Sequence, residues 1–331
     1  MTAVPKSVRL LNGRRMPTVG LGTWQSTNSE EVKNAVRVAI EEGYRHIDTA
    51  KAYQNEADIG SVLQELITEG KITRDEMFIT TKLWMTGMAP ENVRKETLTS
   101  LEKLKTDYID LYLIHFPVAL VDTIPKDSPS PLLPMYANGA CKTAFIDPLD
   151  TWREMEKLVD DGLVKAIGLS NFNKEQLRRI YEQARIKPAN IQMECHAWFP
   201  QYDLLDFCKT RGISFAAYAP IGSPGKPPTA GRKIPVLMDE PVLQEIASKH
   251  NKSVAQVLLR NLLQRGIIVL PKSVTPARIK SNFQVYDFEL DSEDIDMVKG
   301  INKELQMFHV EALGKQNFSH PFFPWPHLID S

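Results

Sequence analysis

Four polar side chains stand at or just beyond the ends of predicted β-strands in the first part of the chain. Asp48 closes one such strand, and Tyr53 follows shortly after it. Lys82 and His115 close the next two strands. An acid, a phenol, an ammonium and an imidazole that meet at one site can deliver a proton to a carbonyl oxygen. These four residues are therefore the first candidates for a catalytic group.

The proposed chemistry needs these residue types together. A tyrosine phenol is a weak acid with a pKa of about 10, and a nearby ammonium is expected to lower that pKa. Lys82 can supply the ammonium, Asp48 can keep a buried Lys82 charged, and His115 can orient the substrate oxygen. Each residue alone has a commoner structural explanation, as a helix cap, a solvated lysine, a packed ring or a core histidine. Their coincidence at consecutive strand ends favours catalysis.

The elements that must position these residues alternate along the chain. Amphipathic helical stretches such as 30–42, 89–105 and 174–184 separate short β-rich runs. The first has one apolar face, and Asn173 with Gln176 three residues later marks the start of the third; that face comprises Val32, Ala35, Val36, Ala39 and Ile40. Strands are predicted at Thr18–Leu21, Tyr44–Asp48, Met77–Thr81, Ile109–His115, Val164–Leu169, Asn190–Glu194, Ser214–Ala217 and Ile267–Leu270. Repeated β-then-α units imply a parallel sheet, and roughly eight of them predict an α/β fold, a single (β/α)₈ TIM barrel over residues 1–331. The carboxyl ends of the strands would then converge on one mouth.

Other segments complete the expected barrel. The Asn12-Gly13 turn predicts an N-terminal β-hairpin, which we place at the bottom of the barrel. The proline-rich segments 118–147 and 221–241 show no periodicity and are expected to overhang the mouth. The tail, 303–331, ends in aromatic residues and prolines, and we expect it to dock near the active site without helical structure.

Composition limits the classes of function. The formal net charge of -1 gives no general attraction to nucleic acid or to anionic membranes. The three cysteines, Cys141, Cys195 and Cys208, form no Cys-x-x-Cys, which predicts reduced thiols in a cytoplasmic protein without a zinc site or other metal. The chain shows no signal-peptide core and no bilayer-spanning run. A closed barrel has no free sheet edge, so we expect a monomer.

Further polar residues at the same mouth indicate a ligand. Ser170, Asn171 and Gln192 can satisfy a carboxamide, and Tyr218 offers a flat face for stacking, a combination that fits a nicotinamide ring. Gly20-Leu-Gly22-Thr23-Trp24 begins like a dinucleotide fingerprint but lacks the third glycine. Its glycines are better explained by a turn over the barrel rim beneath a ligand.

An anion site is expected after the eighth strand. Lys272, Ser273 and Arg278 lie next to a predicted helix start, where backbone amides and the helix dipole favour negative charge. Loops in this position are the usual phosphate site of such barrels. The alternative is a solvated basic turn.

The chain resembles the aldo-keto reductase superfamily over nearly its whole length. The segments that carry the resemblance are Gly20-Leu-Gly-Thr-Trp24, His46-Ile-Asp-Thr-Ala50, Leu113-Ile-His-Phe-Pro117, Gly168-Leu-Ser-Asn-Phe172 and Ile-Val-Leu-Pro-Lys272-Ser. The long mouth loops and the tail resemble the aldose and aldehyde reductase branch. The resemblance implies NADPH-dependent reduction of aldehydes and ketones, with Tyr53 as proton donor, Asp48 and Lys82 as its tuning pair, and His115 as substrate orienter.

The resemblance also implies how the cofactor, NADPH or NADP⁺, is bound. It would lie extended across the mouth, with Lys272, Ser273 and Arg278 at its 2′-phosphate and Asn282 near adenine. The full implied set is Gly22, Thr23, Trp24, Asp48, Ser170, Asn171, Gln192, Tyr218, Ile221, Ser223, Lys272, Ser273, Val274, Thr275, Arg278 and Asn282.

Two positions depart from the family pattern. Phe116 follows His115 where many vertebrate aldose reductases carry tryptophan, so their substrate preference is not carried over. Ser281 precedes Asn282 where glutamate is common. Trp24, Trp84, His115 and Phe116 are expected to line the substrate site. Because phenylalanine offers no hydrogen-bond donor, this wall favours apolar or aromatic carbonyl compounds over small sugars.

Two other classes of function remain as alternatives. A non-enzymatic member of the family, either a cofactor-binding regulatory subunit or an abundant structural protein, would retain the fold, since fold alone does not imply function. An esterase or aldolase on the same barrel would need a Gly-x-Ser-x-Gly motif, which is absent, or Lys82 free of Asp48.

Overall fold

The computed structural model of the protein describes residues 4–126, 128, 130–136, 139–224, 236–309 and 313–325. Within these residues, eight parallel strands form one sheet, in the order β12, β11, β10, β9, β6, β5, β4, β3. Their bounds are β3 (Leu21–Gly22), β4 (His46–Asp48), β5 (Phe78–Leu83), β6 (Leu111–Ile114), β9 (Ile167–Ser170), β10 (Asn190–Glu194), β11 (Ser214–Tyr218) and β12 (Ile268–Val269). The predicted α/β class and parallel sheet are confirmed.

The sheet closes between its first and last strands. Parallel bridges pair Val19 with Val269 and Gly22 with Lys272. The backbone N–H groups of Gly20 and Gly22 donate to the carbonyls of Val269 and Pro271 at 2.9 and 3.1 Å. Isolated bridges, and not a continuous ladder, join the two ends of the sheet. The strands predicted at 18–21 and 267–270 are therefore observed as the two-residue strands β3 and β12. The predicted barrel is nevertheless confirmed.

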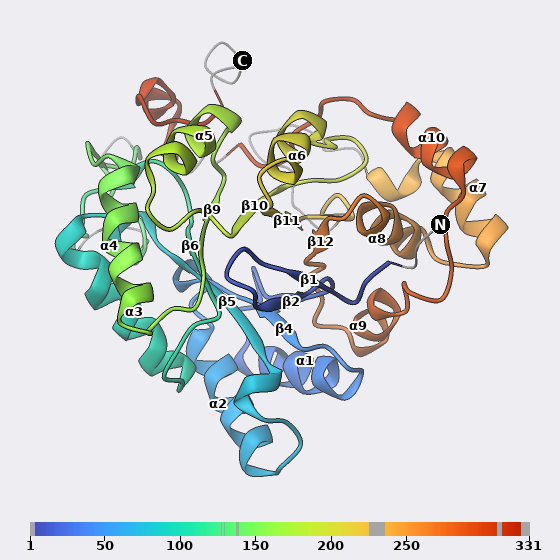
Figure 1. Ribbon diagram of the computed structural model, residues 1–331, viewed down its shortest axis with the longest axis horizontal. Coiled ribbons are helices and arrows are strands. Elements are labelled where there is room, and N and C mark those ends of the chain that lie inside the picture. The colour runs from blue at the N-terminus through green and yellow to red at the C-terminus, as the bar shows by residue number, and fades with distance from the viewer. Residues whose placement is uncertain are drawn as a thin grey trace.

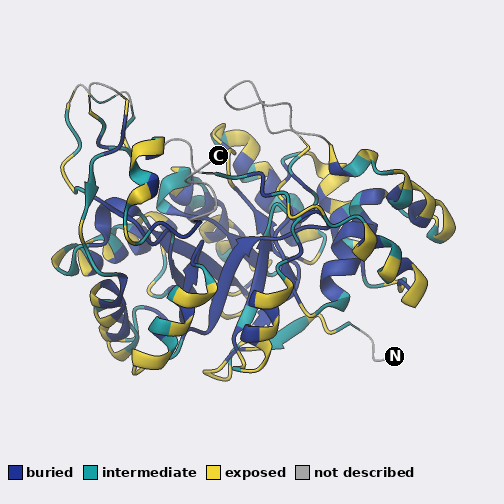
Figure 2. Cartoon of the chain, turned by 90° about the horizontal axis from the view of Figure 1, so that it is seen from above, coloured by how far each residue is buried: buried dark blue, intermediate teal, exposed yellow. Residues whose placement is uncertain are grey.

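Helices surround the strands (Figure 1). They are α1 (Ser29–Glu41), α2 (Glu56–Thr68), α3 (Pro90–Leu104), α4 (Pro148–Asp160), α5 (Lys174–Gln183), α6 (Tyr202–Lys209), α7 (Pro241–His250), α8 (Val254–Gln264), α9 (Pro276–Phe283) and α10 (Ser292–Gly300). Helix α1 buries the apolar face predicted from its spacing: Val32, Ala35, Val36, Ala39 and Ile40. Figure 2 shows the resulting arrangement, with buried strands in the centre and exposed residues on the outer helices. No helix in the described ranges is long and apolar enough to cross a bilayer.

Capping residues fix where several helices begin. Asn173 and Gln176 form the capping box of α5, as their spacing predicts, and Asp291 forms one with Asp294 at α10. Each box satisfies backbone N–H groups that the first helical turn leaves without partners. Helix α5 therefore begins within a few residues of the end of β9, and this short connection keeps the polar residues after β9 at the mouth.

The N-terminal hairpin closes the bottom of the barrel, as expected. Its strands are β1 (Ser7–Arg9) and β2 (Arg15–Pro17), paired antiparallel. Leu10 and Met16 are buried in one cluster with barrel residues that include Phe78 and Leu111, at the start of β5 and β6. Burying one such side chain contributes about 1.5–3 kcal/mol, so the hairpin is an integral part of the core.

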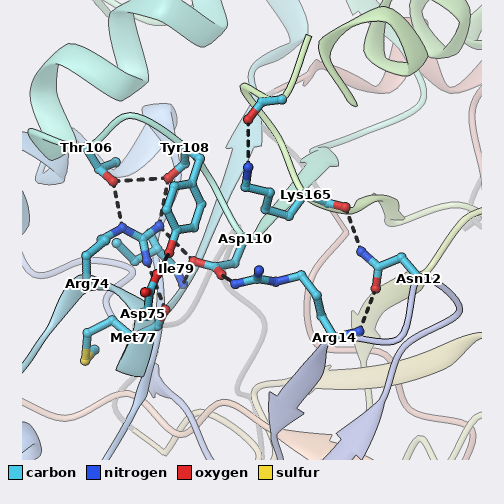
Figure 3. Close-up of polar contacts among 11 residues, drawn as sticks. Asn12, Arg14, Arg74, Asp75, Met77, Ile79, Thr106, Tyr108, Asp110 and Lys165 are labelled. Carbon is cyan, nitrogen blue, oxygen red and sulfur yellow. Dashed lines mark hydrogen bonds and ion pairs between the residues drawn. The ribbon is translucent and has the colours of Figure 1, made fainter. Parts of the chain in front are cut away.

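A buried carboxylate ties the hairpin to the base of the strands (Figure 3). Asp110 is fully buried; its Oδ2 accepts from Arg74 Nη2 at 2.8 Å and from the backbone N–H of Ile79 at 3.0 Å, and its Oδ1 pairs with Arg14 of the hairpin loop. The Arg74 guanidinium also lies 3.9 Å from the centre of the Tyr108 ring. Removing one partner of a buried ion pair commonly lowers the free energy of unfolding by about 3–5 kcal/mol. This network therefore contributes to stability at the end of the barrel opposite the mouth.

One expectation about the irregular segments was wrong, because the tail contains a 3₁₀ turn at Lys315–Ser319 where no helical structure was expected. The segment 118–147, which shows no periodicity, contains a short antiparallel pair, β7 (Ala119–Leu120) with β8 (Thr143–Ala144). Such short elements carry almost no sequence periodicity and are stabilised by packing, since Ala119, Leu120 and Phe318 are buried. Parts of the expected mouth loops lie outside the described residues, among them Pro129, Gly225, Pro227, Pro228 and Gly231.

Candidate active site

The four residues first singled out lie together at the carboxyl ends of β4, β5 and β6. Asp48 ends β4, Lys82 is the penultimate residue of β5, and His115 directly follows β6. Tyr53 ends a 3₁₀ turn, Lys51–Tyr53, just beyond β4. Parallel pairing in register sets neighbouring strand ends side by side, which is why residues from separate strands share one mouth.

Lys82 is the centre of the group. Its Nζ donates to Asp48 Oδ1 at 2.8 Å, to the carbonyl of Thr49 at 2.9 Å and to Tyr53 Oη at 3.2 Å. The side chain of Lys82 is fully buried and that of Asp48 is 5% exposed. Burial alone would lower the pKa of Lys82, but the nearby Asp48 and Tyr53 outweigh it, and the pKa is raised. The ammonium is therefore charged at neutral pH.

The acidity of Tyr53 differs from the expectation. Lys82 lowers the pKa of Tyr53, as predicted, but burial raises it by more, and Asp48 adds to the increase. The pKa of Tyr53 is therefore raised above its ordinary value of 10.0. The expected net lowering was wrong, because an estimate from residue types alone omits the desolvation of a buried phenol. The phenol is protonated at neutral pH.

His115 is a neutral imidazole next to Tyr53. Burial, together with the charge of Lys82, holds the pKa of His115 well below its ordinary value. The ring packs edge-on against Tyr53 and Trp84, with centroids 5.7 and 5.1 Å apart. Its Nδ1 is buried and has no hydrogen-bond partner among the described residues. A neutral imidazole with unused capacity can hydrogen bond a substrate oxygen.

The polar residues after β9, β10 and β11 form a second, adjoining network. Tyr218 donates its hydroxyl to Asn171 Oδ1 at 2.8 Å. Asn171 Nδ2 in turn donates to the backbone carbonyl of His115 at 2.9 Å and to Ser170 Oγ at 3.1 Å. Asn171 adopts a left-handed conformation, with φ of 65°, which asparagine tolerates better than most residues. The network fixes the carboxamide of Asn171 and the ring of Tyr218 beside His115.

Gln192 joins the two networks. Its Nε2 donates to Asp48 Oδ2 at 2.6 Å, and its side chain is almost fully buried. One carboxylate oxygen of Asp48 therefore accepts a hydrogen bond from Lys82, and the other accepts one from Gln192. Gln192 was expected at the mouth as a carboxamide binder, but its bond to Asp48 was not anticipated. The two residues are 144 positions apart, and only the closed barrel brings them together.

The glycine-containing segment forms part of the rim above β3. Gly20 and Gly22 lie where β3 meets its neighbours: a Cβ on Gly20 would lie 2.7 Å from His46 Nδ1, and one on Gly22 would lie 2.8 Å from the carbonyl oxygen of Leu270. Close packing inside the barrel thus requires both glycines. Thr23 Oγ1 donates to the backbone carbonyl of Asp48 at 2.9 Å, which ties the rim to the catalytic group.

Asn55 is hydrogen bonded to the same rim and was not singled out from the sequence. Its Nδ2 donates to the carbonyls of Thr23 and Ser26 at 2.9 and 3.2 Å, and its Oδ1 accepts from Thr49 at 2.8 Å. Asn55 is 2% exposed. No motif marks it, although a polar residue between a strand end and a helix start is a weak signal of a cap or tether.

The basic residues after β12 surround the start of α9. Lys272, Thr275 and Arg278 are exposed, Ser273 is buried, and Val274 is partly buried. Ser273 Oγ accepts from the backbone N–H of Thr275 at 3.1 Å. In the described ranges, no hydrogen bond or ion pair engages the side chains of Lys272 or Arg278, and neither contacts the catalytic group. These cations are therefore available to a ligand at the helix start.

Asn282 lies on α9 and is 5% exposed. No residue of the described ranges hydrogen bonds to its carboxamide, whose polar atoms are not fully buried. Ile221 and Ser223 begin the loop after β11; Ile221 packs against both neighbouring core clusters, and Ser223 has a φ of 46°. The continuation of this loop, 225–235, lies outside the described residues.

Aromatic side chains surround the mouth. Trp24 is 38% exposed and packs edge-on against Phe308 of the tail, with centroids 5.3 Å apart. Trp84 donates its Nε1 to the carbonyl of Leu132 at 2.8 Å, which links it to the segment after β6. Phe116 is only 3% exposed.

The tail covers Phe116. The Trp325 and Phe323 rings lie 5.5 and 6.4 Å from the ring of Phe116, measured between centroids. Phe322 and Phe323 separate: Phe323 stacks inward on Phe318, whereas Phe322 lies beside the exposed Phe145. Of these two tail phenylalanines, the structure places Phe323 against Phe116.

Glu194, the last residue of β10, is a further buried residue at the mouth that the sequence interpretation passed over. Its carboxylate accepts hydrogen bonds from the backbone of the tail at Met307 and Phe308. A signal was present, because Glu194 closes a predicted strand as Asp48 and Lys82 do.

Comparisons with known proteins agree on the family. The sequence profile of the Aldo/keto reductase family matches residues 18–303. Aldo-keto reductase family 1 member A1 of Gallus gallus is 45% identical over 98% of this chain and 99% of its own. Estradiol 17 beta-dehydrogenase 5 of Mus musculus is 40% identical, with 98% and 99% covered. The solved structure of the aldose reductase from Schistosoma japonicum superposes with a TM-score of 0.87 at 43% identity, covering 97% of this chain and 99% of that one.

Proposed function

Because this chain belongs to the aldo/keto reductase family and is an oxidoreductase, we propose that it reduces aldehydes and ketones to alcohols with NADPH, and that Tyr53 is the general acid. The observation that carries the proposal is the position of Lys82. Its single ammonium is hydrogen bonded to both Asp48 and Tyr53 at the mouth, beside a neutral His115.

The roles of the side chains follow from this geometry. Tyr53 holds a proton at Oη at neutral pH, since its pKa is raised, and can release it to a carbonyl oxygen. Lys82 already donates a hydrogen bond to Tyr53 Oη, so the phenolate that forms when Tyr53 releases its proton keeps a charged partner. Asp48 holds Lys82 in place, and His115 can orient the substrate oxygen. Lys82 is charged and bonded to three oxygens, which argues against its use as a Schiff-base lysine.

The residues at the mouth fit a dinucleotide phosphate cofactor. Lys272 and Arg278 are exposed cations at the start of α9, and the carboxamide of Asn282, whose polar atoms are not fully buried, has no hydrogen-bond partner within the described ranges. Bound NADPH would supply the hydride. Asn171 and Gln192 each retain hydrogen-bonding capacity for a nicotinamide carboxamide, and Tyr218 is held as a stacking face. We propose that the other cofactor-binding residues implied by the family resemblance also contact the bound NADPH.

The proposal extends to the cellular compartment and the oligomeric state of the protein. Cys141, Cys195 and Cys208 are buried and form no disulfide, which supports a reducing compartment such as the cytoplasm. The closed sheet supports a single-domain monomer, since no described strand of the barrel offers an edge to a partner.

The test of the proposed function compares two kinds of substrate. Trp24 and Trp84 favour an aromatic aldehyde over an open-chain sugar, because burying about 100 Å² of ring contributes about 2.5 kcal/mol. We expect NADPH consumption with both, and a kcat/KM for benzaldehyde on the order of 10²-fold above that for xylose. No consumption with any carbonyl compound would refute the function, whereas a higher value for xylose would refute only the apolar pocket.

Arg278→Ala is expected to raise the KM for NADPH about tenfold and to leave the KM for NADH nearly unchanged. The reason is that a guanidinium at this helix start makes charge-assisted hydrogen bonds to a 2′-phosphate, which NADH lacks. Steady-state kinetics with both cofactors measure the effect. Lys280→Ala is the matched control, since Lys280 lies on the same helix but pairs with Glu42. An equal loss for both cofactors would place Arg278 away from the 2′-phosphate.

A further inference from the structure

The chain that follows α10 runs along the loop after β10. Lys303 and Leu305 donate their backbone N–H groups to the carbonyl of Trp198, at 3.3 and 2.9 Å. Trp198 and Met307 belong to one buried cluster, against which Leu305 and Phe308 pack. The start of the tail is thus held by backbone bonds as well as by apolar contact.

Glu194 makes the next two attachments. Its Oε1 accepts from the backbone N–H of Met307 at 2.6 Å, and its Oε2 accepts from the backbone N–H of Phe308 at 2.9 Å. His196 Nε2 lies 2.9 Å from Oε1. The side chain of Glu194 is 1% exposed. Two consecutive backbone donors on the two oxygens of one buried carboxylate fix the direction of the chain at this point, since charge-assisted hydrogen bonds are short and strong.

Phe308 carries this constraint to the mouth. Its ring packs edge-on against Trp24 and against Tyr218, with centroids 5.3 and 5.7 Å apart. Tyr218 pairs with Glu194 in the register of β10 and β11, so the anchor and the ring it positions lie beside the same strand end. Moving the backbone at Phe308 would therefore move an aromatic wall that lies between Trp24 and Tyr218.

We propose that Glu194 is a positioning residue for the carbonyl pocket, which it serves by holding the backbone of Met307 and Phe308 so that the Phe308 ring forms the wall between Trp24 and Tyr218. This inference rests on the proposed function, because it assigns that wall to the carbonyl substrate. Glu194 touches neither Lys82 nor Tyr53 by any hydrogen bond in the described ranges, so it is not assigned to the proton transfer. It governs how well an aromatic substrate is held.

Hydrogen exchange tests the anchor without any assay of activity. Glu194→Gln keeps the size of the side chain but leaves only one acceptor oxygen, so at least one of the two backbone N–H groups loses its partner. We expect amide exchange in 303–309 to accelerate about tenfold or more, with α1 to α5 unchanged. The matched control is Glu156→Gln. Glu156 lies on the outer helix α4, is also buried, and accepts a hydrogen bond from the backbone N–H of Ile186 at 2.8 Å. It should leave exchange in 303–309 unchanged.

Kinetics test the consequence for the substrate. Glu194→Gln is expected to raise the KM for an aromatic ketone about tenfold while kcat changes less than threefold, and to leave the KM for a two-carbon aldehyde unchanged. Phe308→Ala should show the same pattern. The double variant should be no worse than either single variant, because both act through the same ring.

The outcomes separate this inference from the proposed function. If the wild-type protein reduces no carbonyl compound, the proposed function fails, and the exchange experiment still decides whether Glu194 anchors the tail. Unchanged exchange in 303–309 would overturn the anchor. Accelerated exchange with equal loss of kcat for large and small aldehydes, or with additive effects in the double variant, would overturn the positioning role.

Discussion

Tyr53→Phe is expected to lower the rate of carbonyl reduction by a factor on the order of 10²–10⁴, the usual contribution of a positioned general acid. The variant keeps the ring that packs against His115 and lies under Lys82, whose Nζ is 4.8 Å from the ring centre, so the fold and cofactor affinity should be preserved. Single-turnover rates at saturating NADPH measure the loss, and fluorescence titration measures cofactor binding.

Tyr112→Phe is the control for Tyr53→Phe, because Tyr112 is a buried tyrosine of β6 outside the catalytic group. It should retain wild-type turnover. The pH profile offers a second check: since the pKa of Tyr53 is raised, reduction should stay level through neutral pH and fall only when the pH exceeds the ordinary phenol pKa of about 10. Turnover of Tyr53→Phe within threefold of wild type would show that another group delivers the proton.

Lys82→Met is expected to abolish most activity and to destabilise the fold by about 3–5 kcal/mol, the usual cost of leaving one partner of a buried ion pair alone. Asp48 would keep its bond from Gln192 but lose its cation, and Tyr53 would lose the ammonium that stabilises its phenolate. Denaturant unfolding measures the loss of stability, and NADPH consumption measures the loss of activity.

The double variant Asp48→Asn with Lys82→Met distinguishes the two effects. It removes both charges, so no buried ion is left unpaired, and most of the lost stability should return. Activity should not return, because nothing then stabilises the Tyr53 phenolate. A double variant as unstable as Lys82→Met would show that Lys82 contributes through packing and its bond to Thr49, and that the ion pair is not the source of the stability.

The sequence by itself was sufficient for the barrel and for the meeting of its strand ends. Alternating strands and amphipathic helices are the pattern of a parallel sheet, and parallel strands bring their carboxyl ends to one face. Asp48 ends its strand, Lys82 is the penultimate residue of its strand and His115 follows its strand, so their common location follows from topology. The apolar spacing of α1 and the capping box of Asn173 were equally readable, because both depend on neighbours within a few residues.

Other features depend on contacts between distant segments, which only the tertiary structure decides. Gln192 reaches Asp48, and Glu194 reaches Met307 and Phe308, because closure of the barrel and the path of the tail bring them within hydrogen-bond distance. The short β7–β8 pair and the 3₁₀ turn at 315–319 form where packing supports them, with too few residues to show a period.

The acidity of Tyr53 combines both kinds of information. Residue types indicate that Lys82 lowers the pKa of the phenol, and the structure agrees about that contribution. Whether the pKa rises or falls overall depends on how completely water is removed from Tyr53, which is a property of the folded mouth. The sequence thus determined which groups meet and the sign of each pairwise interaction. The tertiary structure decided their burial, and with it the net protonation of the site.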